Sequence, residues 1–154
     1  MRKWYFLLLI IGLFSCDSAR IYEEFNEVEQ FWRTGQALSY AFEIEDPKTS
    51  YTVIAEIKND LNYPYRNFYF NYRLQTEADS VLKESLEQIQ LFEPISGKPF
   101  GSGIGDQYNN EMVLEEGIQF PVAGKYQIDL EQFMRVDSLT GIQRVGVRIE
   151  KVEK

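Results

Sequence analysis

Apolar and polar residues alternate one by one over most of this 154-residue chain, and a period of two is the repeat of a β-strand rather than of a helix. The clearest case is NFYFNYRLQ at residues 67–75, where the apolar side chains fall on one side of the backbone. Successive side chains of a strand point to opposite faces, so such a segment buries one face and exposes the other. The pattern predicts a chain built from half-buried strands.

The same alternation recurs in other segments that are rich in aromatic and β-branched residues and bounded by turn formers. They are residues 40–45, 51–59, 125–130 and 144–152. Short strands at intervals of about 8–15 residues are typical of an antiparallel sandwich. We therefore predict an all-β fold over residues 25–154, a single antiparallel β-sandwich of jelly-roll or immunoglobulin-like type with about 7–9 strands.

Two segments do not follow the simple alternation. Residues 79–92 carry apolar side chains at near-helical spacing, but the segment can equally form two short strands, with Ile89 and Leu91 sharing a face. We favour strand there, because every neighbouring segment is strand, and helix stays the alternative. Residues 131–135 are expected to form a short helical turn before Gly141.

The N-terminal segment resembles a bacterial export signal. Arg2 and Lys3 precede an apolar run from Trp4 to Phe14, and a helix of that length spans only about 16 Å, well short of a bilayer core of about 30 Å. The run ends in Ser15-Cys16, which resembles the lipobox of bacterial lipoproteins. We expect residues 1–15 to be removed, Cys16 to carry lipid, and residues 16–24 to form a short tether. An ordinary signal peptide with a coincidental cysteine is the alternative.

Charge and composition remove several classes of function. The chain has 16 Lys and Arg against 24 Asp and Glu, so nucleic acid is not an expected partner. Without residues 1–15 the balance is 14 against 24, a net charge of −10, which anionic lipid surfaces repel. There is no histidine, and Cys16 is the only cysteine, so histidine catalysis, histidine–zinc sites and internal disulfides are excluded. We predict no catalytic residues, no metal and no cofactor.

A glycine cluster, Gly101-Ser-Gly-Ile-Gly-Asp106, is the one motif that invites a phosphate-binding interpretation. No Lys-Ser or Lys-Thr follows it and no strand–helix context surrounds it, so we interpret it as a loop that needs positive φ and close backbone approach. Asp106 with nearby Asn and Glu side chains offers oxygen ligands for Ca²⁺, but the spacing matches no EF-hand loop and suits a solvated turn.

Aromatic residues are abundant, and most of them fall on the apolar faces of the predicted strands. Tyr63-Pro-Tyr-Arg66 differs, because proline fixes this segment as a loop. Aromatic and arginine side chains are enriched where proteins bind one another, so Trp32, Tyr65 and Arg66 are candidates for a docking patch. The alternative is that these aromatics fold back over the edge of the sandwich.

The chain resembles the gliding-motility lipoprotein GldH family of Bacteroidetes. The resemblance begins with Ser15-Cys16 and Trp32 and continues through Tyr63-Pro-Tyr-Arg66, the Gly101–Asp106 cluster and residues 134–150. Lys98-Pro-Phe100 stands where the family has a tryptophan-bearing turn. The order and spacing of these pieces carry the resemblance, because each one alone is weakly specific.

The resemblance implies an accessory component of surface gliding and of type IX secretion rather than an enzyme. It also implies a lipid anchor, which we place in the outer membrane with the domain in the periplasm. We expect docking of other envelope proteins through Trp32, Tyr65, Arg66, Asp106 and Arg135. The alternative function is a glycan-binding lipoprotein, in which Trp32 and loop tyrosines stack on sugar rings.

Overall fold

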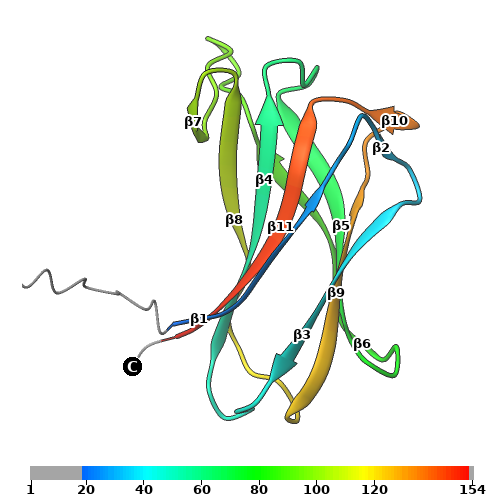
Figure 1. Cartoon of the computed structure of the whole chain (residues 1–154), viewed down its shortest axis with the longest axis vertical. Helices are drawn as coiled ribbons and strands as arrows, with labels where there is room; N and C mark the ends of the chain where they lie inside the picture. The colour runs from blue at the N-terminus through cyan, green and yellow to red at the C-terminus, as the bar shows by residue number, and fades with distance from the viewer. Residues whose placement is uncertain (1–18, 153–154) are drawn as a thin grey trace, which may run out of the picture.

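The computed structural model describes residues 19–152, and this part of the chain is made of strands and turns, with no helix (Figure 1). The predicted signal segment 1–15 and Cys16 lie outside the described residues. Within residues 19–152 there is no helix long and apolar enough to cross a membrane. The strands are β1 (Arg20–Glu27), β2 (Trp32–Arg33), β3 (Ala37–Ile44), β4 (Tyr51–Asp60), β5 (Asn67–Thr76), β6 (Val81–Gln90), β7 (Ser102–Ile104), β8 (Gln107–Ile118), β9 (Gly124–Gln132), β10 (Ser138–Leu139) and β11 (Ile142–Lys151).

Two antiparallel sheets form a sandwich, as the sequence predicted. One has the order β1-β11-β4-β8-β7 and the other β3-β9-β5-β6, while β10 and β2 form a separate two-stranded ribbon. Eight strands have eight residues or more, within the predicted range, and three strands of two or three residues bring the described total to eleven. The sequence did not predict the three short strands, because a segment of two or three residues is too short to show a repeat of two.

Burial follows the alternation of the sequence. In β3 and β9, every second side chain is buried and the residues between are exposed or half-buried. The core is unusually aromatic, and its rings touch one another at centroid distances of 4.7–6.4 Å, a range in which aromatic pairs attract. The side chains that the sequence placed on apolar strand faces, Phe42, Phe68, Phe70 and Tyr126, are all buried.

Residues 79–92 form strand rather than helix, which confirms the favoured interpretation, but they contain the one strand β6 instead of two short strands. Ile89 and Leu91 are both buried, while Val81 and Leu86 are about half exposed because they lie opposite Gln75 and Asn71 on the outer face of the sheet. The helical spacing of these apolar residues is therefore coincidental.

The helical turn expected at residues 131–135 is wrong. Strand β9 continues through Gln132, and the next residue stays attached to the sheet because the Phe133 N–H donates to the Tyr69 carbonyl at 2.9 Å. The buried Gln132 side chain then accepts the Met134 N–H at 2.8 Å. These two bonds satisfy the backbone groups that a helical turn would have to pair otherwise.

The first strand begins earlier than expected. Strand β1 starts at Arg20, which pairs with Glu150 of β11, so residues 20–24 belong to the five-stranded sheet and not to a tether.

The register of the strands gives the sandwich two distinct ends. At the near end, β1 begins and β11 finishes, with Arg20 opposite Glu150. At the far end lie residues 61–66, 105–106 and 133–141, where Asp60 pairs with Gln107 and Asn59 with Ile142 (Figure 1, top). The ten residues of β11 run from one end to the other, about 30 Å at a rise of about 3.3 Å per residue.

Four carboxylates surround one arginine on the outer face of the five-stranded sheet. Arg148 of β11 lies 2.6 Å from Glu56, 2.9 Å from Glu111, 2.8 Å from Glu150 and 4.0 Å from Glu23, with only 12% of its side chain exposed. These groups come from β1, β4, β8 and β11, so Arg148 links all the long strands of this sheet. Burial raises the pKa of Glu56, whereas the hydrogen bond from Arg148 lowers the pKa of Glu111.

Candidate docking site at the far end

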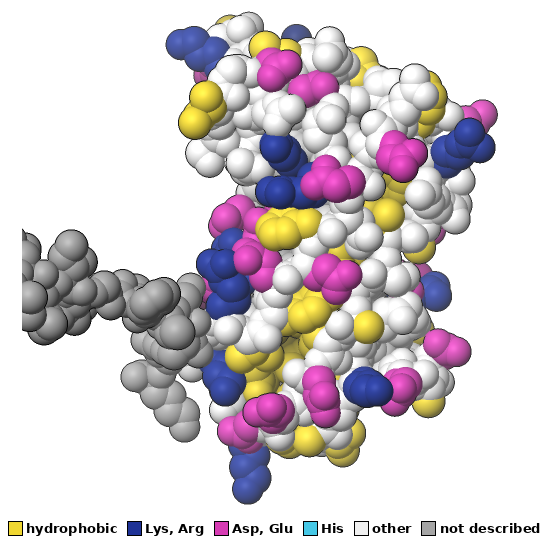
Figure 2. All heavy atoms as spheres, in the orientation of Figure 1, with side chains coloured by type: hydrophobic (Ala, Val, Ile, Leu, Met, Phe, Trp, Pro, Cys, Tyr) yellow, Lys and Arg dark blue, Asp and Glu magenta, His cyan; other side chains and the backbone are white. Residues whose placement is uncertain are grey.

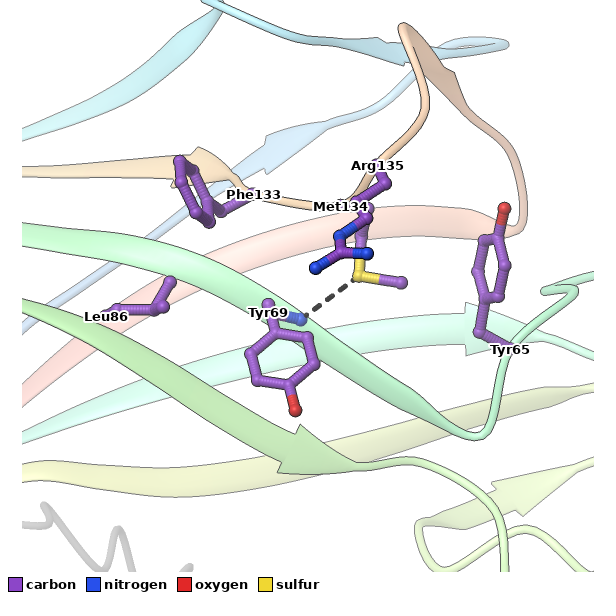
Figure 3. Close-up of a pocket in the computed structure, with 6 residues that line it drawn as sticks. All are labelled: Tyr65, Tyr69, Leu86, Phe133, Met134 and Arg135. Carbon is purple, nitrogen blue, oxygen red and sulfur yellow. Dashed lines mark hydrogen bonds between the residues drawn. The ribbon is translucent and has the colours of Figure 1, made fainter.

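An apolar groove of about 410 Å³ opens at the far end, on the outer face of the four-stranded sheet. Its lining comes from the loop before β5, from β5 and β6, and from the segment after β9: Tyr65, Tyr69, Leu86, Phe133, Met134 and Arg135. Figure 3 shows Phe133 and Leu86 toward one end of the groove and Tyr65 at the other, with Met134 and Arg135 between them.

The strands place the apolar side chains of the groove outward. Tyr69 lies between the buried Phe68 and Phe70, so its ring must point away from the core. Leu86 lies opposite Asn71 and so also points outward, and it is 52% exposed. Phe133 is 56% exposed. Large apolar side chains gathered on a surface mark binding sites more often than isolated ones do.

The middle of the groove is held firmly to the sheet. The Tyr69 N–H donates to the Met134 sulfur at 3.3 Å, which is the dashed line in Figure 3, and the Tyr69 carbonyl accepts the Phe133 N–H at 2.9 Å. Residues 133–134 therefore behave as a continuation of β9 along β5, and the groove is formed before any partner arrives.

The loop Tyr63-Pro-Tyr-Arg66 divides between core and surface. Tyr63 is buried and its hydroxyl donates to the Asn67 carbonyl at 2.8 Å, so this tyrosine folds back over the sandwich edge. Burial raises its pKa. The ring of Tyr65 packs edge-on against Tyr63 at 5.8 Å and is 36% exposed at the rim of the groove.

Two arginines beside the groove carry uncompensated charge. Arg135 lines it and Arg66 follows Tyr65, and both side chains are exposed. Among residues 19–152, neither guanidinium has a carboxylate within 4.0 Å. The groove therefore combines an apolar floor with free positive charge on an acidic domain, which suits an apolar segment that carries a carboxylate.

Trp32 does not belong to this site, and its assignment as a docking residue is wrong. Its side chain is 1% exposed, its indole N–H donates to the Gln36 carbonyl at 2.8 Å, and its ring packs on Phe68 at 5.6 Å. The same burial prevents Trp32 from stacking on a sugar ring, so the glycan-binding alternative loses the residue on which it depended.

We expect Trp32→Phe to lower the free energy of unfolding by about 1–3 kcal/mol, because the variant loses ring volume and leaves the Gln36 carbonyl without its donor. Urea denaturation followed by far-ultraviolet circular dichroism measures the change. The conservative exchange Tyr65→Phe at the exposed rim is the control and should leave stability nearly unchanged. Equal stability of the two variants would contradict the buried role of Trp32.

Asp106 lies at the far end but outside the groove. It occupies the exposed turn between β7 and β8, on the other sheet, where its carbonyl accepts the Leu61 N–H at 3.2 Å. The glycine cluster before it is a strand-connecting loop, as predicted: φ is +74° at Gly105, and a Cβ at Gly103 would overlap the Gln107 carbonyl oxygen. No group of three or more acidic or cysteine side chains placed to hold a metal occurs within residues 19–152.

The structure therefore brings Tyr65 and Arg135 together, places Arg66 beside them, and separates Asp106 and Trp32 from them. The groove residues that the sequence analysis missed are Tyr69, Leu86, Phe133 and Met134. The available signal was an apolar side chain at an outward position of a strand, as at Tyr69. This signal is weak, because the sequence alone does not show that β5, β6 and the segment after β9 come together at one groove.

Comparison with known proteins gives a family match over most of the chain. Residues 20–149 match the model of the GldH lipoprotein family. A gliding motility lipoprotein GldH homolog from Christiangramia forsetii is 28% identical over 153 residues, which are 95% of this chain and 93% of that protein. Gliding motility lipoprotein GldH from Flavobacterium johnsoniae is 28% identical over 152 residues, with 94% and 93% covered.

Solved structures give only distant similarity. The structure of infectious bursal disease virus Gx strain aligns with 90% of this chain and 34% of its own at a TM-score of 0.40 and 11% identity. Dimeric latent PorU from Porphyromonas gingivalis aligns with 86% of this chain and 13% of its own at a TM-score of 0.28 and 10% identity. Similarity at these TM-scores carries no argument about function.

Proposed function

Because the chain belongs to the GldH lipoprotein family, we propose that it serves surface gliding as a non-catalytic docking module held on a membrane by lipid. The observation that carries the docking role is the apolar groove at the far end, rimmed by Arg135, which has no carboxylate within 4.0 Å among residues 19–152. The partners are other envelope proteins of the gliding and type IX secretion machinery, which contact Tyr65, Arg66, Arg135 and the neighbouring Asp106 loop.

Lipid on Cys16 anchors the near end of the sandwich. Cys16 is four residues before Arg20, a stretch that reaches at most about 14 Å. The near end then stays close to the lipid, and the far end stands about 30 Å further out. We place the anchor in the outer membrane and the domain in the periplasm. The acidic surface supports a domain that does not lie flat on anionic lipid.

The groove is tested in cells by a strain whose own copy carries Phe133→Ser with Arg135→Glu. Both side chains are exposed, so the variant should fold normally while the groove loses its apolar and its positive contribution. We expect colony spreading and secretion of type IX cargo to fall to the level of a deletion strain. Crosslinks from Tyr65 to motility or secretion components should disappear as well.

The matched control is Val122→Ser, which removes an apolar side chain of similar exposure (60%) between β8 and β9, at the other end of the sandwich. It should spread and secrete normally. Normal spreading and secretion by the groove variant, with the protein present at its usual amount, would refute the docking role.

A further inference from the structure

Three of the four lateral sheet edges are protected against pairing with another strand. Edge strands are commonly protected by inward-pointing charges, bulges or short covering strands. In β6, Lys83 lies opposite the buried Leu74 and therefore points inward, where it meets Glu115 at 3.7 Å. In β1, Glu24 lies opposite the buried Val147 and also points inward.

The third protected edge is formed by β8, which is protected by the short strand β7 and by β-bulges. Three residues of β7 cover the start of β8, and the register of β8 with β4 shifts twice further along, between Tyr51 and Ile54. Register shifts also accompany the two charged edges, near Arg20 in β1 and after Leu74 beside β6. Bulges of this kind twist an edge and interrupt its regular hydrogen-bonding pattern.

Strand β3 has none of these protections. Its eight residues pair with β9 without a register shift, and its inward side chains are all apolar: Leu38, Tyr40, Phe42 and Ile44. Its outward side chains are small at three of four positions, namely Ala37, Ser39 and Ala41. Within the described chain no strand pairs with its other side. The register of this edge is regular, and its outer side is unpaired within the described residues.

Acidic side chains flank the open edge of β3. A cavity of about 420 Å³ at its start is lined by Glu27 and Glu29, and one of about 230 Å³ at its end by Glu43 and Glu45. In the described part of the chain, none of these four carboxylates has a cation within 4.0 Å. Arg33 and Lys151 also line the two cavities, so acidic groups outnumber basic ones by two to one.

The gap between β1 and β3 adds apolar surface and one more carboxylate. Figure 2 shows apolar side chains gathered in the lower half of the face, between β1 and β3 as Figure 1 places them, with acidic side chains around them. Tyr22 of β1 packs on Phe42 of β3 at 5.7 Å, and its hydroxyl donates to Glu24 at 2.6 Å. A strand added to β3 would therefore face an aromatic ring and a carboxylate on its inward side.

We propose that the open edge of β3 binds an extended segment of a partner protein in which apolar residues alternate with lysine or arginine. The main chain of that segment would extend the four-stranded sheet by one strand, which is a known mode of peptide recognition. Its apolar residues would face Tyr22 and Phe42 on the inward side, and its cations would meet Glu43 and Glu45 on the outward side, so the charge complementarity selects against acidic strands. This surface is separate from the groove, so either can bind without the other.

The test uses a synthetic octapeptide of alternating valine and lysine with blocked ends, and a valine–glutamate octapeptide as its control. Binding to the domain is followed by amide hydrogen exchange in nuclear magnetic resonance. We expect the lysine peptide to slow exchange in Ala37–Ile44 at least tenfold and to leave β6 unchanged, while the glutamate peptide has no effect. No binding of the lysine peptide, or slowed exchange outside β3, would overturn the proposal.

A charge-reversed variant separates edge pairing from general attraction to an acidic protein. Glu43→Lys with Glu45→Lys should weaken binding of the lysine peptide at least tenfold. The control, Glu84→Lys with Glu116→Lys, makes the same change of net charge at exposed positions on other strands, β6 and β8, and should keep most of the affinity. Equal weakening by both variants would overturn the proposal. Slowed exchange in β3 without peptide, rising with protein concentration, would instead assign the edge to a second copy.

Discussion

Arg148→Met is expected to lower the free energy of unfolding by about 3–5 kcal/mol, because Glu56, Glu111 and Glu150 lose their shared cation while Glu23 keeps its ion pair with Arg20. Glu56 is the most sensitive of them, since burial already raises its pKa with Arg148 in place. For a domain of this size the midpoint temperature should fall by about 10–20 °C. Methionine keeps much of the side-chain volume, so the loss reports charge rather than a cavity.

The difference in unfolding free energy between the native protein and the Arg148→Met variant should become smaller as the pH falls. Without the cation, the folded-state pKa of Glu56 rises further above its unfolded value, so the folded variant takes up protons and gains stability as the pH falls. In the native protein Glu56 changes in the same direction but less, because Arg148 counteracts the effect of burial on its pKa. The stability that Glu111 contributes through its lowered pKa is lost only below pH 5. Urea denaturation at pH 7 and pH 5 should therefore show a smaller difference between the two proteins at pH 5.

Arg73→Met is the matched control, since Arg73 also forms a cross-strand ion pair, with Glu84 at 3.0 Å, but both side chains are about half exposed. Exposed pairs contribute little, so this variant should unfold almost as the native protein does. A double variant, Arg148→Met with Glu56→Gln, should recover part of the loss. If Arg148→Met is no less stable than the control, the cluster does not hold the sheet together.

Cys16→Ser is expected to move the protein completely from the membrane fraction to the soluble fraction. Each buried CH₂ of an acyl chain contributes about 0.8 kcal/mol to membrane binding, so two or three chains make attachment effectively permanent. Serine offers no thiol for lipid attachment, and the acidic domain itself is repelled by anionic lipid. Fractionation and incorporation of labelled palmitate measure the result, and Ser15→Ala, which keeps a small residue before the cysteine, is the control.

This variant also separates the anchor from the groove. Cells with Cys16→Ser should spread poorly because the domain is mislocalised, whereas the groove variant should stay in the membrane fraction and still spread poorly. Retention of the Cys16→Ser protein on membranes, with no palmitate label in either protein, would show that another part of the chain holds it there.

The alternation of apolar and polar residues was enough to predict β3, β4, β5, β9 and β11, because a period of two is a local property of the chain. It did not predict β1, most of which was assigned to a tether, or β8, whose sequence lacks a clean alternation. It could not reveal β2, β7 or β10, which have two or three residues each. The helical turn predicted at residues 131–135 is also wrong, because the Gln132 side chain accepts a hydrogen bond from the Met134 backbone N–H. Local propensity is overruled there by bonds to β5, which no local pattern contains.

The candidate site was predictable only in part, because exposure is not a property of residue type. Trp32 and Tyr65 are both aromatic residues outside the alternating segments, yet Trp32 is 1% exposed and Tyr65 is 36% exposed. The sequence singled out Tyr65 and Arg135, which are 70 positions apart, but only the pairing of β9 with β5 brings them to one groove.

The position of β11 has a consequence for the time at which this protein can fold. The last strand of the chain lies between the first strand and β4, so β1 has no partner until residues 142–151 have been made. A chain that is threaded through a membrane N-terminus first must therefore cross it without a finished five-stranded sheet. Folding then follows translocation, and a chain that loses the ten residues of β11 leaves both β1 and β4 with an unpaired side.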